Sequence, residues 1–427
     1  MRITASFILA IAILFAGCSA RQAMPTTAAA PSHSVTSPQV VQTDKEPIHW
    51  EQFAWGDPSL VPPTVDIITG PDKNMWYTDY FDSTLIKMTM AGKTTSFPLS
   101  FDGGMMQFMP SQIAVGADGN FYMPDYNAPV FGVMTPSGVL TTYPIPSKDT
   151  SRYSGVTLGP DGNVWFVELG HIAKITTAGM ITEYAYPSND TTNYYGGIVT
   201  GPDGNLWATE AGDSLIDKIV PSTGAITTYS LGCSGFGIVL AKSDNDLWVN
   251  CGNQMARVTT APAVTIFPTG YQVLQDPASI TVGPDGNPWF VASGAANVIG
   301  EISGVNEIET VYFPPGGFAT DQAITLGPDG NLWALDDHQK VDVYILNPLN
   351  VSPRNIVLAS SGATATITVS EKGVSSWTAT SNKTSVVTVA QGTSNKKFVA
   401  TAHAAGTAQI TIADAKGNSV LVSVTVH

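Results

Sequence analysis

The sequence predicts an all-β protein, a seven-bladed β-propeller followed by a small β-sandwich. The first observation is a short phrase, GPDGNLW in its fullest form, that recurs seven times at intervals of 41 to 46 residues. Repeats of about 40–45 residues that each supply four strands are typical of propeller blades. The second observation is that this period stops near residue 352, where short alternating runs begin. The aromatic residues that mark the seven copies are Trp76, Tyr122, Trp165, Trp207, Trp248, Trp289 and Trp333.

One copy, residues 154–187, shows how a repeat becomes a blade. GVTLG alternates and is small, which suits an inner strand beside a crowded axis. PDGN predicts a turn, because proline fixes φ, aspartate bonds locally and glycine accepts a positive φ. VWFVE, HIAKITT and MITEYAY predict the second, third and outer strands. We expect the tryptophans to fill the wedges between blades. We expect the PDGN aspartates to form turns, because the spacing lacks the further carboxylates of a calcium site.

The seventh copy predicts how the ring closes. After its third strand, VDVYILNP, no outer strand follows, whereas residues 48–54 before the first copy match the outer-strand pattern. We therefore predict that residues 48–54 complete the last blade of a propeller that spans residues 47–349. Closure removes exposed sheet edges. Since a closed ring needs no partner for stability, we expect a monomer.

Residues 350–427 predict a separate β-sandwich of about seven strands. Runs such as ATATITV and VLVSVTV alternate apolar and polar residues and are separated by turn residues. This segment resembles bacterial immunoglobulin-like domains attached to surface proteins. The resemblance implies a spacer or, alternatively, an adhesive module.

The N-terminus predicts a lipoprotein signal peptide over residues 1–17. Arg2 supplies the positive charge, and the apolar run after it is too short for a membrane span. FAGC resembles a bacterial lipobox, with Phe15 in place of an aliphatic residue, and implies cleavage before Cys18 and lipid attachment to its sulfur. Ordinary signal cleavage nearby is the alternative. Residues 18–46, rich in Ala, Thr, Ser and Pro, predict a flexible tether.

Location and partners follow from this N-terminus and from the charge. No later segment is a run of 18 or more apolar residues, so we expect membrane attachment through the N-terminal lipid only, at the bacterial cell envelope, periplasmic or cell-surface. The net charge of −15 argues against nucleic acid as a partner. It favours metal ions and cationic ligands, although an acidic surface also serves solubility alone.

Cys233 and Cys251 both fall in the fifth repeat. Cys233 precedes the first strand of that blade, and Cys251 ends the second. Antiparallel pairing brings these positions close together, and an oxidising compartment favours a bond. We predict a disulfide, with two reduced buried thiols as the alternative.

The residues that end the second strands predict an acidic channel mouth. In a propeller these strand ends share one face with the loops around the central channel, where ligands usually bind. Like charges that converge there raise each other's pKa or recruit a cation such as magnesium or calcium; alternatively, each carboxylate pairs with backbone N–H groups or water. His171 and His338 follow on loops of the same face and, with Glu168 and Glu210, are candidate catalytic residues. Five of the seven strand ends are carboxylates: Asp79, Asp125, Glu168, Glu210 and Asp336.

Apolar and aromatic residues also gather in loops at this face. They are candidates for the wall of a ligand pocket, and local loop packing is the alternative. The residues are Met105, Met106, Phe108, Tyr153, Tyr194, Tyr195 and Phe236.

The phrase GPDGNLW, followed by a short strand that ends in Glu, resembles the virginiamycin B lyase family. The resemblance covers residues 47–349 and implies a seven-bladed propeller that opens cyclic streptogramin antibiotics by elimination with magnesium assistance. In that family a catalytic His begins an inner strand, in a pattern like H-x-I-T-x-G-x-D-G-x-L-W-F-T-E. No blade carries the His at the corresponding position, 14 residues before the strand-ending residue. Those positions hold Val65, Ser111, Ser154, Gly196, Phe236 or Gly237, Ala278 and Gln322.

Two functional hypotheses stay open. The first is a lipid-anchored propeller that binds a small molecule or a surface partner at the channel mouth without catalysis. The second is an enzyme, either a lyase of the virginiamycin B type or a metal-dependent hydrolase that uses the acidic ring. Elimination needs a base and an acid with pKa values near neutrality, which Ser, Gly and Gln do not supply unaided. This departure favours the first hypothesis, whereas the carboxylates and loop histidines favour the second.

Overall fold

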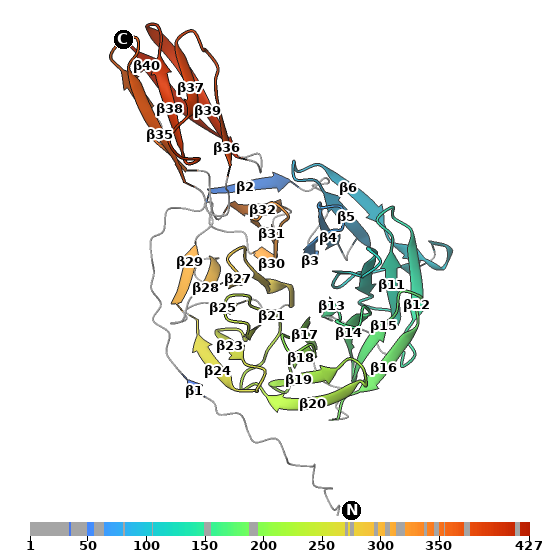
Figure 1. Cartoon of the computed structure of the whole chain (residues 1–427). Coiled ribbons are helices and arrows are strands. Elements are labelled where there is room, and N and C mark those ends of the chain that lie inside the picture. Colours follow the sequence, from blue (N-terminus) through green and yellow to red (C-terminus); the bar gives the residue numbers. More distant parts are fainter. Residues whose placement is uncertain are drawn as a thin grey trace, which may run out of the picture. The chain divides into compact units, whose positions relative to one another are not determined.

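The protein is described by a computed structural model in which strands dominate. It describes residues 34–35, 49–54, 64–79, 82–104, 106–148, 155–187, 195–269, 272–273, 277–293, 298–303, 308–312, 321–336, 340–345, 350–353, 355–370, 376–414 and 419–427. Seven sheets surround one axis, as Figure 1 shows, and residues from all seven line or adjoin the same central cavity. Within these described ranges no helix is long and apolar enough to cross a membrane. The predicted seven-bladed all-β propeller is confirmed.

Blades 1 to 4 are four-stranded antiparallel sheets whose strands pair in chain order, from the axis outward. Blade 1 comprises β3 (Thr64–Thr69), β4 (Met75–Asp79), β5 (Thr84–Met88) and β6 (Thr94–Pro98). Blade 2 comprises β9 (Ala114–Val115), β10 (Phe121–Pro124), β11 (Val130–Met134) and β12 (Leu140–Pro144). Blade 3 comprises β13 (Val156–Leu158), β14 (Val164–Glu168), β15 (His171–Ile175) and β16 (Ile181–Ala185). Blade 4 comprises β17 (Tyr195–Thr200), β18 (Leu206–Glu210), β19 (Leu215–Val220) and β20 (Ala225–Ser230).

Blades 5 and 6 each carry one additional strand. Blade 5 comprises β21 (Ile238–Leu240), β22 (Leu247–Asn250), β23 (Gln254–Val258) and β24 (Val264–Pro268). Blade 6 comprises β26 (Ile280–Val282), β27 (Pro288–Ser293), β28 (Val298–Ser303) and β29 (Ile308–Tyr312), and β25 (Gln272–Val273) also pairs with β27. The strand β1 (Ser34–Val35) pairs in parallel with β24, although it lies within the predicted tether. The sequence did not predict this strand, because two residues carry no alternation.

Blade 7 closes the ring with a strand from the other end of the propeller. Its first three strands, from the axis outward, are β30 (Asp321–Leu326), β31 (Leu332–Asp336) and β32 (Lys340–Ile345). The outer strand is β2 (His49–Ala54), which pairs antiparallel with β32 from His49 opposite Ile345 to Ala54 opposite Lys340. The prediction that residues 48–54 complete the last blade is confirmed.

Each wedge between blades contains an aromatic side chain that is held by its own turn. In blade 3, Trp165 is fully buried, and its Nε1 donates to Asp161 Oδ1 at 2.9 Å. The same carboxylate accepts the backbone N–H of Asn163 at 3.2 Å. Lys174 Nζ lies 3.4 Å from Asp161 Oδ2 and 5.0 Å from the centroid of the indole ring. The predictions that the tryptophans fill the wedges and that the aspartates serve the turns are confirmed. Equivalent bonds join Asp72 to Trp76, Asp203 to Trp207, Asp244 to Trp248, Asp285 to Trp289 and Asp329 to Trp333.

Aromatic residues on the outer strands connect neighbouring blades. Phe53 on β2 stacks on Trp333 of its own blade with ring centroids 5.8 Å apart. On the other side of the Phe53 ring lies Gly92, in the turn between β5 and β6 of blade 1. A Cβ at Gly92 would lie 2.2 Å from the Phe53 ring, and φ there is +75°, so glycine is required twice over. The closing strand therefore makes the contact between blades that Tyr143 makes with Gly179 and Tyr184 with Gly224.

The C-terminal segment forms two four-stranded sheets around one apolar core, which includes Ile367, Val387, Ile410 and Val422. The described residues of this segment form eight strands, where the sequence predicted about seven. The immunoglobulin-like resemblance stays a prediction. One sheet contains β33 (Asn350–Ser352), β35 (Thr364–Ser370), β38 (Lys397–Ala402) and β37 (Val387–Gln391). The other contains β34 (Asn355–Leu358), β40 (Ser419–Val426), β39 (Gly406–Asp414) and β36 (Trp377–Ser381).

Candidate functional site

The five strand-ending carboxylates are all buried. Each ends a second strand or directly follows it, at the turn toward the third strand. The exposed fractions are 0% for Asp79, 1% for Asp125, 0% for Glu168, 4% for Glu210 and 0% for Asp336. Burial of an ionisable group disfavours its charged form unless hydrogen bonds compensate. The partners of each carboxylate therefore decide what it can do.

Three of the carboxylates accept backbone N–H groups of neighbouring loops. Asp125 accepts from the backbone N–H groups of Met109, Asn127 and Ala128 at 2.8, 2.8 and 2.6 Å. Burial raises the pKa of Asp125, and these three bonds oppose that rise. Asp336 Oδ1 accepts the N–H of Lys340 at 2.7 Å, and Asp79 Oδ1 accepts the N–H of Asp82 at 3.1 Å. The alternative of local backbone pairing therefore describes these three residues. The backbone partners are Met109, Asn127, Ala128, Lys340 and Asp82.

Glu210 belongs to a buried acid pair inside blade 4. Its partner is Asp217 on the neighbouring strand β19, which is fully buried and accepts a hydrogen bond from Thr228 Oγ1. Burial, followed by the hydrogen bond and the charge of Glu210, raises the pKa of Asp217 well above its ordinary value, while the Thr228 bond lowers it. Two carboxylates in this arrangement share a proton most stably.

Blade 7 contains a second acid pair, bridged by an amide. Gln52 Nε2 donates to Asp342 Oδ1 at 2.8 Å and lies 3.4 Å from Asp336 Oδ2. Asp342 occupies the same place on its third strand as Asp217, because each faces an alanine of the second strand, Ala334 and Ala208. The Gln52 amide of β2 therefore donates to Asp342 in blade 7, as the Thr228 hydroxyl donates to Asp217 in blade 4.

The carboxylates do not gather into a metal-binding group. Among the described residues, no set of three or more His, Cys, Asp or Glu side chains is placed to hold a metal ion. Oxygens of Asp79, Asp125 and Asp336 already accept N–H groups, and an N–H donor and a cation compete for the same lone pairs. Within the described part of the chain, these side chains do not fit the magnesium or calcium site that the sequence suggested.

The candidate histidines are placed only in part. His171 begins β15, is half-buried, and has Nδ1 3.2 Å from the carbonyl oxygen of Leu169. His338 lies outside the described residues. The pairing of β14 with β15 places the candidates Glu168 and His171 opposite one another, whereas Glu210 ends β18 in the next blade.

The residues predicted to form an apolar pocket wall lie in different environments. Phe108 is fully buried and lies against Gly132 in the core of blade 2, so it packs the loop and does not line a pocket. Met106 is 47% exposed. Phe236 is half-buried, and its carbonyl accepts the N–H of Gly197 and the Thr209 hydroxyl, at 2.5 and 2.7 Å. Met105, Tyr153 and Tyr194, and the side chain of Tyr195, lie outside the described residues.

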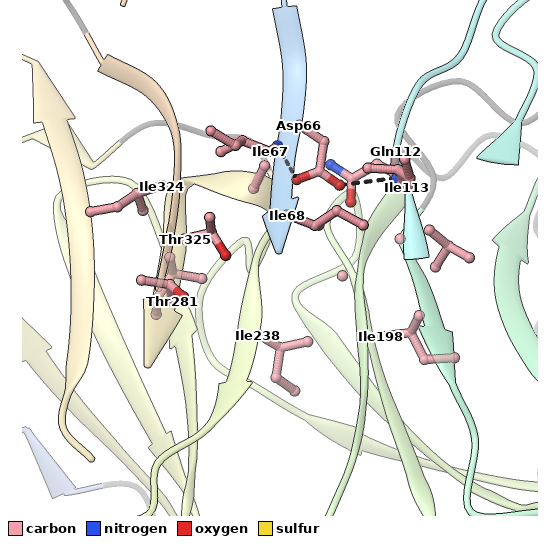
Figure 2. A pocket seen from close by; sticks show the side chains of 15 residues that line it. Asp66, Ile67, Ile68, Gln112, Ile113, Ile198, Ile238, Thr281, Ile324 and Thr325 are labelled. Carbon is pink, nitrogen blue, oxygen red and sulfur yellow. Dashed lines mark hydrogen bonds between the residues drawn. The ribbon is translucent and has the colours of Figure 1, made fainter. Parts of the chain in front are cut away.

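The channel itself carries polar residues that the sequence analysis missed. The central cavity has a volume of about 180 Å³. Figure 2 shows side chains that line it. Besides Ile68 and Ala278, its apolar lining includes one branched residue from each of the seven blades. The residue before each of these is small in five blades but is Asp66 in blade 1 and Gln112 in blade 2. At the matching positions of the other blades the sequence has only glycine, serine or alanine. This contrast was the signal in the sequence that could have identified Asp66 and Gln112. The branched residues are Ile67, Ile113, Val156, Ile198, Ile238, Ile280 and Ile324.

The two cysteines of the fifth repeat lie at bonding distance. The sulfur atoms of Cys233 and Cys251 are 2.14 Å apart, and the Cα atoms are 5.8 Å apart. Cys251 directly follows β22, in the place that Glu168 and Glu210 take in their blades. A disulfide at this position ties the loop before β21 to the end of β22.

The positions 14 residues before the buried acids are closely packed. A Cβ at Gly196 would lie 1.7 Å from Thr209 Oγ1 and 2.4 Å from the Thr209 carbonyl oxygen. Ser111, in blade 2, is fully buried and donates from its hydroxyl to the Pro124 carbonyl oxygen at 3.3 Å. Ala278, 14 residues before Ala292 in blade 6, is also buried. At Gly196 no side chain of any size fits without a shift of β18.

Comparison with known proteins places these features in a family. The model of the virginiamycin B lyase family matches residues 49–231 and 186–345, which are overlapping stretches of the propeller. A virginiamycin B lyase of Nocardia farcinica is 29% identical over 121 residues; the match covers 28% of this chain and 40% of that relative. The chain thus spans less than half the length of that curated relative.

Solved structures agree with the family model. Virginiamycin B lyase from Staphylococcus aureus has a TM-score of 0.59 at 24% identity, with 69% of this chain and 98% of that chain covered. A catalytically inactive variant of the Staphylococcus aureus enzyme, with alanine in place of a histidine and with quinupristin present, is 25% identical with a TM-score of 0.58; the match covers 69% of this chain and 99% of that one. With the ring of seven blades, these matches show that the chain belongs to the virginiamycin B lyase family.

Proposed function

We propose that this family member binds a small molecule at the channel mouth without opening it. The observation that carries the proposal is the packing of Gly196 against Thr209, at the place where the family pattern puts its histidine before Glu210. The matching positions of the other blades also have no histidine. A relative becomes catalytically inactive when a histidine is replaced by alanine, which supports the importance of this residue type.

The state of the acids supports the same proposal. General acid–base catalysis requires a group that reaches the substrate and has a pKa near the working pH. Asp125 and Asp336 are buried and already accept loop N–H groups, while Glu210 is paired with Asp217. Asp125 and Asp336 therefore stabilise the loops of the mouth, and Glu210 is held within its own blade.

The ligand is proposed from the family and from the mouth. Quinupristin accompanies the inactive relative, so a streptogramin is the first probe to use. Phe236 is half-buried at the inner end of blade 5, with its backbone fixed between blades 4 and 5. Loop aromatic side chains on such a rigid frame can provide apolar contact area for a cyclic ligand.

Turnover and binding can be measured on the same sample. Purified chain is incubated with quinupristin, with and without magnesium, and the products are followed by liquid chromatography and mass spectrometry. Binding is measured by calorimetric titration of the wild type, of Phe236→Ala and of Met180→Ala. Met180 is an exposed residue between β15 and β16, at the end of the blade away from the mouth, and serves as the matched control.

We expect saturable binding without ring opening, weakened in Phe236→Ala and unchanged in Met180→Ala. Ring opening above the rate of the enzyme-free sample contradicts the proposal and supports the lyase alternative. Absence of both binding and ring opening excludes streptogramins as ligands of the mouth.

We also propose that the protein is anchored in the bacterial cell envelope by lipid at Cys18. The support is the N-terminal sequence, in which FAGC follows a basic residue and an apolar run. Cells that express the full chain are labelled with radioactive palmitate, and the chain is then isolated. Label in the wild type and its loss in Cys18→Ser support the proposal, whereas label-free wild-type chain contradicts it.

A further inference from the structure

We propose that Asp66 and Gln112 bind one hydroxyl group on the propeller axis, supplied by a water molecule or by a small polyol. The site lies inside the channel, between the inner strands of blades 1 and 2. It does not depend on the ligand proposed for the mouth, because it is built from different residues.

The Gln112 side chain provides the first argument. Gln112 is 5% exposed and lines the central cavity. Its Nε2 has no hydrogen-bond partner among the described protein atoms. Buried amide N–H groups nearly always have an acceptor, which is often an ordered oxygen outside the protein. The structure thus assigns to this nitrogen an acceptor from the contents of the channel.

Asp66 provides the second argument, because its carboxylate is fixed beside Gln112. Asp66 Oδ1 accepts the N–H of Ile67 at 2.8 Å, and Oδ2 accepts the N–H of Ile113 at 3.0 Å, across the gap between blades (Figure 2). Since Ile113 directly follows Gln112, this bond holds the two polar side chains next to one another. A carboxylate has about four lone-pair sites, so it can accept a further donor.

The chemistry of the pair selects the ligand class. A group that lies between them must accept from Gln112 and can donate to Asp66. A hydroxyl does both, whereas a metal cation meets the N–H groups of Gln112, Ile67 and Ile113 and accepts none of them. An anion would accept from Gln112 but would meet the charge of Asp66.

The position of the pair on the ring provides the third argument. At the matching positions of blades 3 and 4 are Gly155 and Gly197, and a Cβ at Gly155 would lie 2.8 Å from both Gly196 O and Gly197 Cα. The inner strands are too close there for any side chain. Long polar side chains therefore occur at this position in blades 1 and 2, where the neighbouring inner strands leave room, and both line the cavity.

The size of the cavity limits the occupant. Its volume of about 180 Å³ is below the range of about 300–1,000 Å³ that is usual for drug-sized ligands. At about 30 Å³ per water molecule, it suits a few waters or one small polyol. The ligand of this site is therefore smaller than a streptogramin.

The test compares the full-length wild type with Gln112→Leu and with Thr325→Val. Leucine keeps the volume but removes the amide. Thr325 lines the same cavity from blade 7, so its valine variant removes a hydroxyl elsewhere and serves as the matched control. High-resolution crystal structures are determined without polyols, and each protein is titrated with erythritol by calorimetry. Gln112→Met replaces Gln112→Leu if circular dichroism shows that the leucine variant is unfolded.

We expect an ordered oxygen within hydrogen-bond distance of both side chains in the wild type and in Thr325→Val, and its loss in Gln112→Leu. Saturable binding of erythritol that weakens about tenfold or more in Gln112→Leu identifies a polyol hydroxyl as a ligand. The ordered oxygen without erythritol binding identifies water. A wild-type structure without such an oxygen, or an oxygen that persists unchanged in the leucine variant, overturns the proposal.

Discussion

Gln52 donates a hydrogen bond to Asp342 across 290 residues of sequence, at 2.8 Å from Nε2 to Oδ1. The amide belongs to β2, the strand that closes the ring, and the carboxylate is fully buried in β32. Asp336 Oδ2 lies 3.4 Å from the same nitrogen. The closing strand is thus held by a polar contact as well as by its backbone pairing and the Phe53 ring.

The first prediction concerns this contact. Gln52→Leu should lower the free energy of unfolding by about 1–3 kcal/mol, because it removes one hydrogen-bond donor from a buried carboxylate. Urea denaturation followed by tryptophan fluorescence measures the change. Ser96→Ala is the matched control: Ser96 takes the corresponding place on the outer strand of blade 1 but is exposed and faces Ile86. Equal stability of Gln52→Leu and wild type would show that the amide contributes nothing to closure.

The second prediction concerns the turn aspartates at low pH. Burial alone would raise the pKa of Asp203, but bonds from Lys218, Asn205 and Trp207 outweigh it and lower the pKa to about 2. Since the pKa is lowered in the folded chain, this stability is present above pH 4 and is lost as the pH falls toward 2. Asp203→Asn and Lys218→Met should both flatten the acid limb of the unfolding free energy against pH. The exposed Lys148 provides a control, and Lys148→Met should leave the limb unchanged.

The third prediction concerns Asp217, whose contribution to stability changes with pH in the opposite direction. The pKa of Asp217 is raised, by burial and then by Glu210, so its contribution to stability is present at low pH and is lost as the pH rises through the raised pKa. The unfolding free energy of Asp217→Asn relative to wild type should therefore increase between pH 4 and pH 8. Asp213→Asn, at an exposed position of the same blade, should show no such increase. A difference that does not change with pH would contradict the shared proton.

The fourth prediction concerns the cysteines. A disulfide between Cys233 and Cys251 closes a short loop, with a sequence separation of 18. Removal by the double substitution to alanine should cost about 3 kcal/mol of unfolding free energy through the entropy of the unfolded chain. Peptide mapping without reductant, on protein exported by its own signal, should recover the linked peptides. Two free thiols in that material would refute the bond.

The fifth prediction concerns metal ions. Because Asp79, Asp125 and Asp336 accept N–H groups and the strand-ending acids form no metal-binding group among the described residues, titration with magnesium or calcium should give no stoichiometric binding. Isothermal calorimetry of the full chain measures this. Tight binding that Asp79→Ala or Glu168→Ala abolishes would support the enzymatic alternative.

The sequence alone determined the architecture of the ring. The interval between the GPDGN turns, the aromatic residue after each turn and the outer-strand pattern of residues 48–54 are local signals that repeat. Each of them acts through contacts within a blade or with its neighbour, such as the bond from Trp165 to Asp161. Repeats of this kind can be recognised without coordinates, because every copy makes the same local contacts and therefore keeps the same residue types. The same register also placed the five carboxylates correctly at the ends of the second strands.

Only the tertiary structure decided what those carboxylates do. Their partners are loop N–H groups, such as that of Met109 for Asp125, or side chains distant in sequence, such as Gln52 for Asp336, and these contacts follow from loop conformation and strand order. The same holds for Asp66 and Gln112, which face one cavity because the inner strands of blades 1 and 2 lie side by side. Residue type records that an atom can donate or accept. Which atom lies opposite, and whether water reaches it, is fixed by the packing of the whole ring.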